Sequence, residues 1–191
     1  GILYTLTLPP STPYWIAAVG IVFGILFGKM VFGGFGKNIF NPALVARAFI
    51  YISFPEPLTI SWTKASLSFP GGLFTYLNEG IEMVSTATPM LMFRDSGTML
   101  SPLELLIGNV SGSIGETSGV LIVLAGAYLI YKKVASWQTM AGCVVGFLGL
   151  SSILFFAGVG QIPNPLYGFI AGGFLFGTVF MATDPVSSPK T

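Results

Sequence analysis

The chain has 191 residues, of which 53% are hydrophobic and only 8% are charged, whereas a soluble globular domain carries roughly 25% charged residues. Because so few polar groups cannot cover the surface of a soluble fold, the composition predicts a membrane protein. The net charge of +1 argues against a nucleic-acid binder, and a single cysteine without any histidine excludes a four-cysteine iron–sulfur site within the chain.

Three apolar runs are long enough to cross a bilayer, which takes about 20 residues. They cover residues 14–32, 134–159 and 166–183. Each run contains several glycines, which we attribute to close helix packing in lipid. Because the sequence begins inside an apolar stretch, we expect an internal piece of a longer subunit. Residues 1–191 then form one transmembrane domain that is incomplete at both ends.

Two other apolar runs, residues 42–54 and 119–131, are too short to cross a bilayer. Each follows a Gly-rich turn and a polar capping cluster. Asn41 is expected to cap the first run ahead of Pro42, and Glu116 is expected to help cap the second. Short helices after Gly-rich breaks, recurring in two halves, indicate discontinuous half-helices around a site near the membrane midplane. Two ordinary short helices between loops are the alternative.

Residues 55–100 form one long polar excursion, and excursions of this length are usually functional. Lys132 and Lys133 occupy a tight turn between two apolar runs, which predicts that this turn faces the cytoplasm. We therefore expect the 55–100 loop on the opposite, extracytoplasmic side.

The run from Glu82 to Met90, with the sequence EMVSTATPM, is the most informative feature. It offers three small hydroxyl groups after an acidic residue, and Pro89 holds Thr88 in an extended conformation. A modifying enzyme could grip such a peptide. From these residues alone, an ordinary Ser/Thr turn is the favoured interpretation.

This stretch resembles the flavinylation sequence Asp-x-x-Ser/Thr-Gly-Ala-Thr, in which a flavin transferase attaches FMN to the last Thr through a phosphoester. The segments FGGFGKNIFNPALVARAF, GNVSGSIGETS and FMATDPVSS occur around it in the matching order. Together they are similar to the flavin-bearing membrane subunit family shared by two complexes. The family supplies the D component of the Rnf ferredoxin:NAD oxidoreductase and the B component of the sodium-translocating NADH:quinone oxidoreductase.

Two positions depart from the family pattern, because Glu82 replaces the usual Asp and Thr86 replaces the usual Gly. Glu82 keeps the carboxylate, whereas Thr86 adds a hydroxyl that could compete with Thr88 for the flavin. The Thr88–Pro89 pair and the short spacing from Phe49 favour the D component of Rnf.

The resemblance implies an all-α polytopic subunit built from two inverted repeats, with FMN esterified to Thr88 in the 55–100 loop. Ser85, Thr86 and Ala87 would complete the attachment site. It also implies a translocase subunit that relays electrons through FMN while the complex moves Na+ or H+ across the bacterial or archaeal cytoplasmic membrane. The implied partners are other membrane and iron–sulfur subunits and a flavin transferase. A second, non-covalent flavin such as riboflavin is implied as well, without assigned residues.

Charged residues inside a membrane are costly and usually mark function. Arg47 could bind a flavin phosphate or ring oxygen through its planar fork, or pair with a structural carboxylate. Glu116 is a candidate cation or charge-relay residue, or it serves only the dipole of the helix that it caps. Asp184 is a second such candidate, or the start of an Asp-Pro turn.

Two alternatives to the Rnf assignment stay open. Within the family, the alternative is the B component of the quinone-reducing complex. Outside it, the alternative is a channel or transporter without redox chemistry, because broken helices with Gly-rich N-termini also build pores. A yellow chromophore that survives denaturation would favour the redox subunit.

Overall fold

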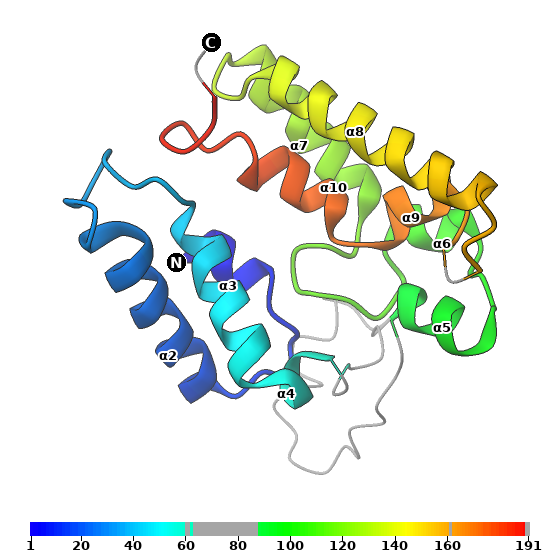
Figure 1. The fold of residues 1–191 in the computed structure, drawn as a ribbon, viewed down its shortest axis with the longest axis horizontal. Helices are drawn as coiled ribbons and strands as arrows, with labels where there is room; N and C mark the ends of the chain where they lie inside the picture. Colours follow the sequence, from blue (N-terminus) through cyan, green and yellow to red (C-terminus); the bar gives the residue numbers. More distant parts are fainter. Residues whose placement is uncertain (60–61, 63–87, 161, 190–191) are drawn as a thin grey trace.

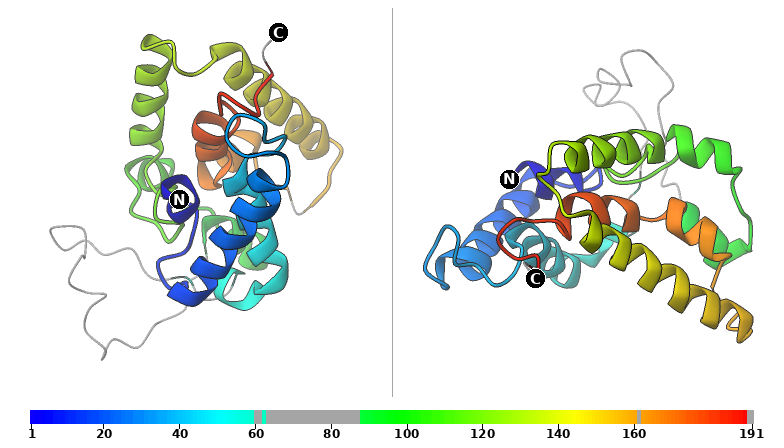
Figure 2. Two further views of the ribbon diagram at one scale, coloured as in Figure 1. Left: turned by 90° about the vertical axis from the view of Figure 1, so that its left-hand side faces the viewer. Right: turned by 90° about the horizontal axis from the view of Figure 1, so that it is seen from above.

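The computed structural model describes residues 1–59, 62, 88–160 and 162–189. Throughout these residues the chain is helical and no strand is present, which confirms the all-α fold class. Figures 1 and 2 show the helices in two groups, with α2 and α3 in one and α7 to α10 in the other. A loop that precedes α7 passes between the groups (Figure 1).

The first group is a helical hairpin preceded by a short helix. Its elements are α1 (Ile2–Leu6), α2 (Tyr14–Ile25), the π-helical extension η1 (Leu26–Met30) and α3 (Pro42–Ser53). Gly24 lies where α2 meets α3, since an added Cβ would stand 2.6 Å from the Cβ of Ala46. The glycines of α2 therefore serve close helix packing, as the sequence indicates.

Both short apolar runs form helices with nearly the expected bounds. Helix α3 begins after Asn41, whose side-chain oxygen accepts a hydrogen bond from the Ala43 amide at 2.9 Å. Helix α7 spans Gly119–Tyr131 and begins after Ser118, whose hydroxyl oxygen accepts from the Leu121 amide at 3.5 Å. The expectation that Glu116 caps α7 is wrong, because Ser118 holds the cap position and the Glu116 side chain points to α3 instead.

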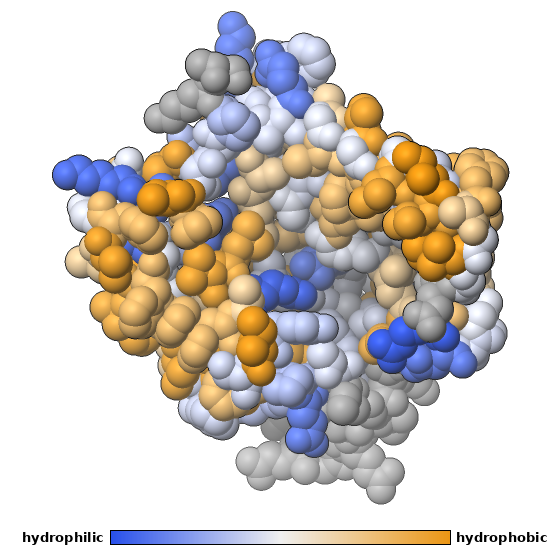
Figure 3. Space-filling view, in the orientation of Figure 1, coloured by the Kyte–Doolittle hydropathy of each residue, from blue (hydrophilic) through white to orange (hydrophobic). Residues whose placement is uncertain are grey.

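The predicted span over 134–159 becomes helix α8 (Trp137–Phe156). Of the helices in the described ranges, α8 is the one with the length and apolar composition to cross a membrane. Only 6% of its apolar window is buried within the structure, so its surface is open to lipid or to other subunits. The space-filling view in Figure 3 shows apolar residues gathered over the outer sides of both helix groups.

The third predicted span, residues 166–183, is not one continuous helix. The segment divides into α9 (Pro165–Ala171), α10 (Phe174–Phe176) and the π-helix η3 (Gly177–Met181). The break falls at Gly172, which has an extended backbone with φ −114° and ψ 168°. The apolar run hid this break, because hydropathy records solvent preference and not backbone conformation.

Short helices lie at the two ends of the predicted 55–100 loop. They are α4 (Pro55–Thr59) at its start and α5 (Pro89–Ser96) near its end, and α6 (Pro102–Ile107) follows. The middle of the loop lies outside the described residues, and Ser85, Thr86 and Ala87 fall there.

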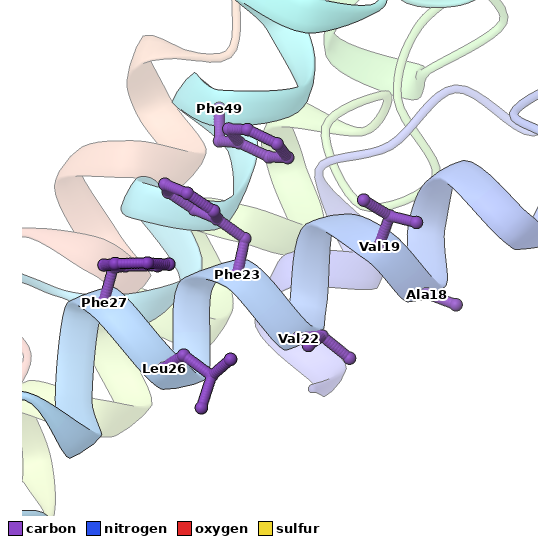
Figure 4. Close-up of a pocket in the computed structure, with 7 residues that line it drawn as sticks. All are labelled: Ala18, Val19, Val22, Phe23, Leu26, Phe27 and Phe49. Atoms are coloured by element: carbon purple, nitrogen blue, oxygen red, sulfur yellow. The ribbon is translucent and has the colours of Figure 1, made fainter.

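A shallow apolar groove runs along the outer face of the hairpin (Figure 4). Residues of α2 and η1 line it together with Phe49 of α3, and the Phe23 and Phe49 rings stack with their centroids 3.8 Å apart. The described residues that line this groove are all apolar, so they offer nothing to hold a polar ligand.

Candidate functional site

Thr88 occupies the N-cap position of the eight-residue helix α5. Its backbone is extended, as Pro89 at the following position requires. The hydroxyl oxygen accepts a hydrogen bond from the Leu91 amide at 3.4 Å, and the residue is half-buried. The structure thus places this hydroxyl at the start of a helix, where backbone amides and the helix dipole favour a negatively charged group.

Arg47 lies in the middle of α3 and faces Glu116 from the loop before α7. The Nη1 atom of Arg47 stands 3.8 Å from Oε1 of Glu116, with 30% and 14% of the two side chains exposed. The same Nη1 atom is buried and makes no hydrogen bond with any described residue. The carboxylate therefore balances the charge of Arg47 and leaves part of the guanidinium fork available for another acceptor.

Glu116 also packs against the break between α9 and α10. A Cβ atom added at Gly173 would stand 2.7 Å from the carboxyl carbon and from both carboxylate oxygens of Glu116. Only a residue without a side chain fits at this contact. The helix break therefore makes room for the carboxylate beside the first residue of α10.

One hollow of about 200 Å³ brings three predicted site residues together. Its lining includes Arg47, Glu116 and Thr88. Ser113 also lines it, is 1% exposed, and has a hydroxyl oxygen with no hydrogen-bond partner in the described part of the chain. Polar groups with unused hydrogen-bonding capacity thus meet at one hollow beside a helix start.

Four residues that shape this site carry little signal in the sequence. Trp62 lines the hollow, and its indole N–H donates to the Thr59 carbonyl at 3.0 Å. Gly172 and Gly173 line it from the break between α9 and α10. A tryptophan within a polar loop is a usable sequence signal, and a Gly-Gly pair inside an apolar run is a weaker one. Nothing in the local sequence distinguishes Ser113.

Asp184 lies outside the lining of this hollow. Its Oδ2 atom accepts hydrogen bonds from the amide and the hydroxyl of Ser187, at 3.3 and 2.6 Å. That geometry belongs to a tight turn after η3, as the Asp-Pro interpretation expects. Among the described residues, no group of three or more His, Cys, Asp or Glu side chains is placed to hold a metal ion.

Comparison with known proteins adds a strong family match. The model of the NQR2, RnfD, RnfE family matches residues 1–191. Proteins named as the B component of the Na(+)-translocating NADH-quinone reductase are 40% identical in Azotobacter vinelandii and 38% identical in Stutzerimonas stutzeri, each over 208 residues. The protein of that name in Yersinia pestis is 38% identical over 199 residues.

Each of these alignments covers 100% of this chain but only 46% of the relative, so the chain spans about half the length of the curated relatives that it matches. Their names fit the quinone-reducing alternative better than the favoured D component of Rnf, and the preference for Rnf finds no support among them. The match over the whole chain makes the wider assignment secure. The chain belongs to the NQR2, RnfD, RnfE family.

Proposed function

We propose that this chain is the flavin-bearing region of a membrane subunit in a sodium-translocating NADH:quinone oxidoreductase, with FMN joined to Thr88 through a phosphoester. The observation that carries the proposal is the position of the Thr88 side chain. It lies on the same hollow as the buried guanidinium of Arg47. The names of the relatives favour this complex over the Rnf complex.

The residues at the hollow suit a phosphate ester. The start of α5 favours negative charge at Thr88, and Arg47 supplies a cation with an unused N–H group. Arg47 would hold the phosphate, and the buried hydroxyl of Ser113 would offer a further hydrogen bond. When bound, a flavin can pass electrons singly between one-electron and two-electron carriers.

Glu116 acts in this proposal through Arg47. Its carboxylate, 3.8 Å from the guanidinium, offsets a charge that would otherwise be left alone in a half-buried site. Glu116 therefore sets how strongly Arg47 attracts an anion. A role for Glu116 or Asp184 in moving a cation belongs to the same proposal and depends on sodium-linked assays.

Four lysines support the proposed orientation in the membrane, namely Lys29, Lys37, Lys132 and Lys133. Asn41 donates to the Met181 carbonyl at 3.4 Å, and Ala135 packs in the same cluster as Met181. These contacts bring the turn at 132–136 to the end of the molecule where α3 begins. Helices α4 and α5 lie at the other end (Figure 1). By the positive-inside rule we place the lysine-bearing end in the cytoplasm and Thr88 on the opposite side.

The partners in this proposal are the remaining membrane and iron–sulfur subunits of the complex and a flavin transferase that loads Thr88. The test compares the parent subunit with Thr88→Ala and Thr88→Ser on a denaturing gel under ultraviolet light. The parent should fluoresce and Thr88→Ala should not, whereas Thr88→Ser keeps the hydroxyl and should retain part of the signal. A Thr88→Ala subunit that fluoresces like the parent would refute the attachment site. A parent without any bound flavin would return the channel interpretation to first place.

A further inference from the structure

Tyr167 connects helix α9 to both ends of the helix that begins after Thr88. Tyr167 is buried, with 8% of its surface exposed. Its hydroxyl donates to the carbonyl of Pro89, the first residue of α5, over 3.4 Å. The same oxygen accepts from the amide of Leu100, a few residues beyond the end of α5, also over 3.4 Å.

The ring of Tyr167 adds a third contact to the same helix. It lies 6.3 Å from the ring of Phe93, centroid to centroid, on the second turn of α5. Helix α5 packs against α9, and Figure 1 shows the two helices side by side with α6 close by. A single side chain therefore meets the start, the middle and the following segment of α5.

Helix α9 carries Tyr167 toward the hollow as well. It ends at the Gly172–Gly173 break, where the Glu116 carboxylate packs. The fixed end of α9 thus stands beside Glu116, and its Tyr167 holds the start of α5. Both sides of the hollow are connected through this short helix.

We propose that Tyr167 is a positioning residue, whose hydroxyl fixes the start of α5 and thereby sets the place of Thr88 relative to Arg47 and Glu116. The consequence for the flavin rests on the proposed function. The hydroxyl satisfies a donor and an acceptor that belong to different segments of the chain. Without it, the Leu100 amide loses this acceptor and α5 keeps only its apolar contact with α9.

Tyr167→Phe is the informative variant, because it removes the hydroxyl and retains the ring that meets Phe93. Tyr128→Phe is the matched control, since Tyr128 is 60% exposed on α7, a helix that packs against α6, α10 and η3. Hydrogen exchange of the full-length subunit in its complex reports on α5 whether or not a flavin is present. In Tyr167→Phe, exchange across residues 90–100 should rise by about threefold to tenfold, as expected for the loss of ordinary hydrogen bonds.

Two flavin measurements complete the test. The amount of covalent FMN in Tyr167→Phe should equal that of the parent, while its fluorescence anisotropy falls and electron transfer slows by at least about threefold. Tyr128→Phe should match the parent throughout. Unchanged exchange across 90–100 would overturn the proposal, and so would faster exchange with unchanged anisotropy and rate. A parent without FMN on Thr88 would refute the proposed function, and the exchange result would still decide whether the Tyr167 hydroxyl holds α5.

Discussion

A methyl group added at Gly173 should separate Glu116 from Arg47. The added Cβ would stand 2.7 Å from the Glu116 carboxyl carbon and from both of its oxygens, so the carboxyl group must move. The end of a Glu side chain is flexible and can shift without unfolding the helix break. The pair is already at 3.8 Å, so a shift away from α3 breaks it.

The expected loss of stability follows from the exposure of the pair. Breaking a fully buried ion pair costs about 3–5 kcal/mol, and losing an exposed one costs about 0.2–1 kcal/mol. With 30% and 14% of the side chains exposed, Gly173→Ala should cost about 1–3 kcal/mol. The backbone at Gly173 has φ −66° and ψ 4°, which alanine tolerates, so backbone strain does not explain a loss.

Gly172→Ala is the matched control on the same break. A Cβ at Gly172 would meet only the Gly168 carbonyl at 3.6 Å, an ordinary contact. Thermal unfolding of the purified subunit should show a clear drop for Gly173→Ala and little change for Gly172→Ala. In a Glu116→Ala background, which lacks the carboxyl group, the added methyl at Gly173 should cost much less. Equal costs for Gly173→Ala with and without the Glu116 side chain would refute this explanation of the contact.

Three further predictions concern the charges and the orientation of the site. Arg47→Lys keeps the charge and loses the planar fork, so it should retain assembly yet slow electron transfer by at least about tenfold in stopped-flow reduction, and a parental rate would contradict bidentate binding. Glu116→Gln should retain folding while changing the sodium dependence of turnover, whereas an unchanged dependence would leave Glu116 with a structural role only. In a Cys143→Ser background, an impermeant thiol reagent added to intact cells should label Thr98→Cys and spare Gln138→Cys, and the reverse pattern would overturn the proposed topology.

The sequence predicted those helices whose ends depend on local chemistry. Asn41 followed by Pro42 specifies the start of α3, since a side-chain cap and a fixed φ act over only a few residues. Helix α8 follows from an apolar run of adequate length. Thr88 shows the limit of local prediction, because an expected loop residue became the cap of α5.

The contacts that assemble the hollow were beyond such prediction. Arg47 and Glu116 lie 69 positions apart in the sequence and meet only when α3 packs near the loop before α7. The break at Gly173 accommodates the Glu116 carboxylate, which no apolar pattern records. The two hydrogen bonds of Tyr167 likewise join segments that are distant in the chain. Tertiary contacts set these features, so local propensity and hydropathy carry no signal for them.

The mass of one tryptic peptide tests the central claim most directly. Cleavage after Lys64 and Arg94 releases residues 65–94, which contain Thr88 together with the competing hydroxyls of Ser85 and Thr86. We expect a peptide heavier by FMN less one water, with fragmentation that places the addition on Thr88. An unmodified peptide from the assembled, yellow complex would contradict the claim, as would an addition located on Ser85 or Thr86.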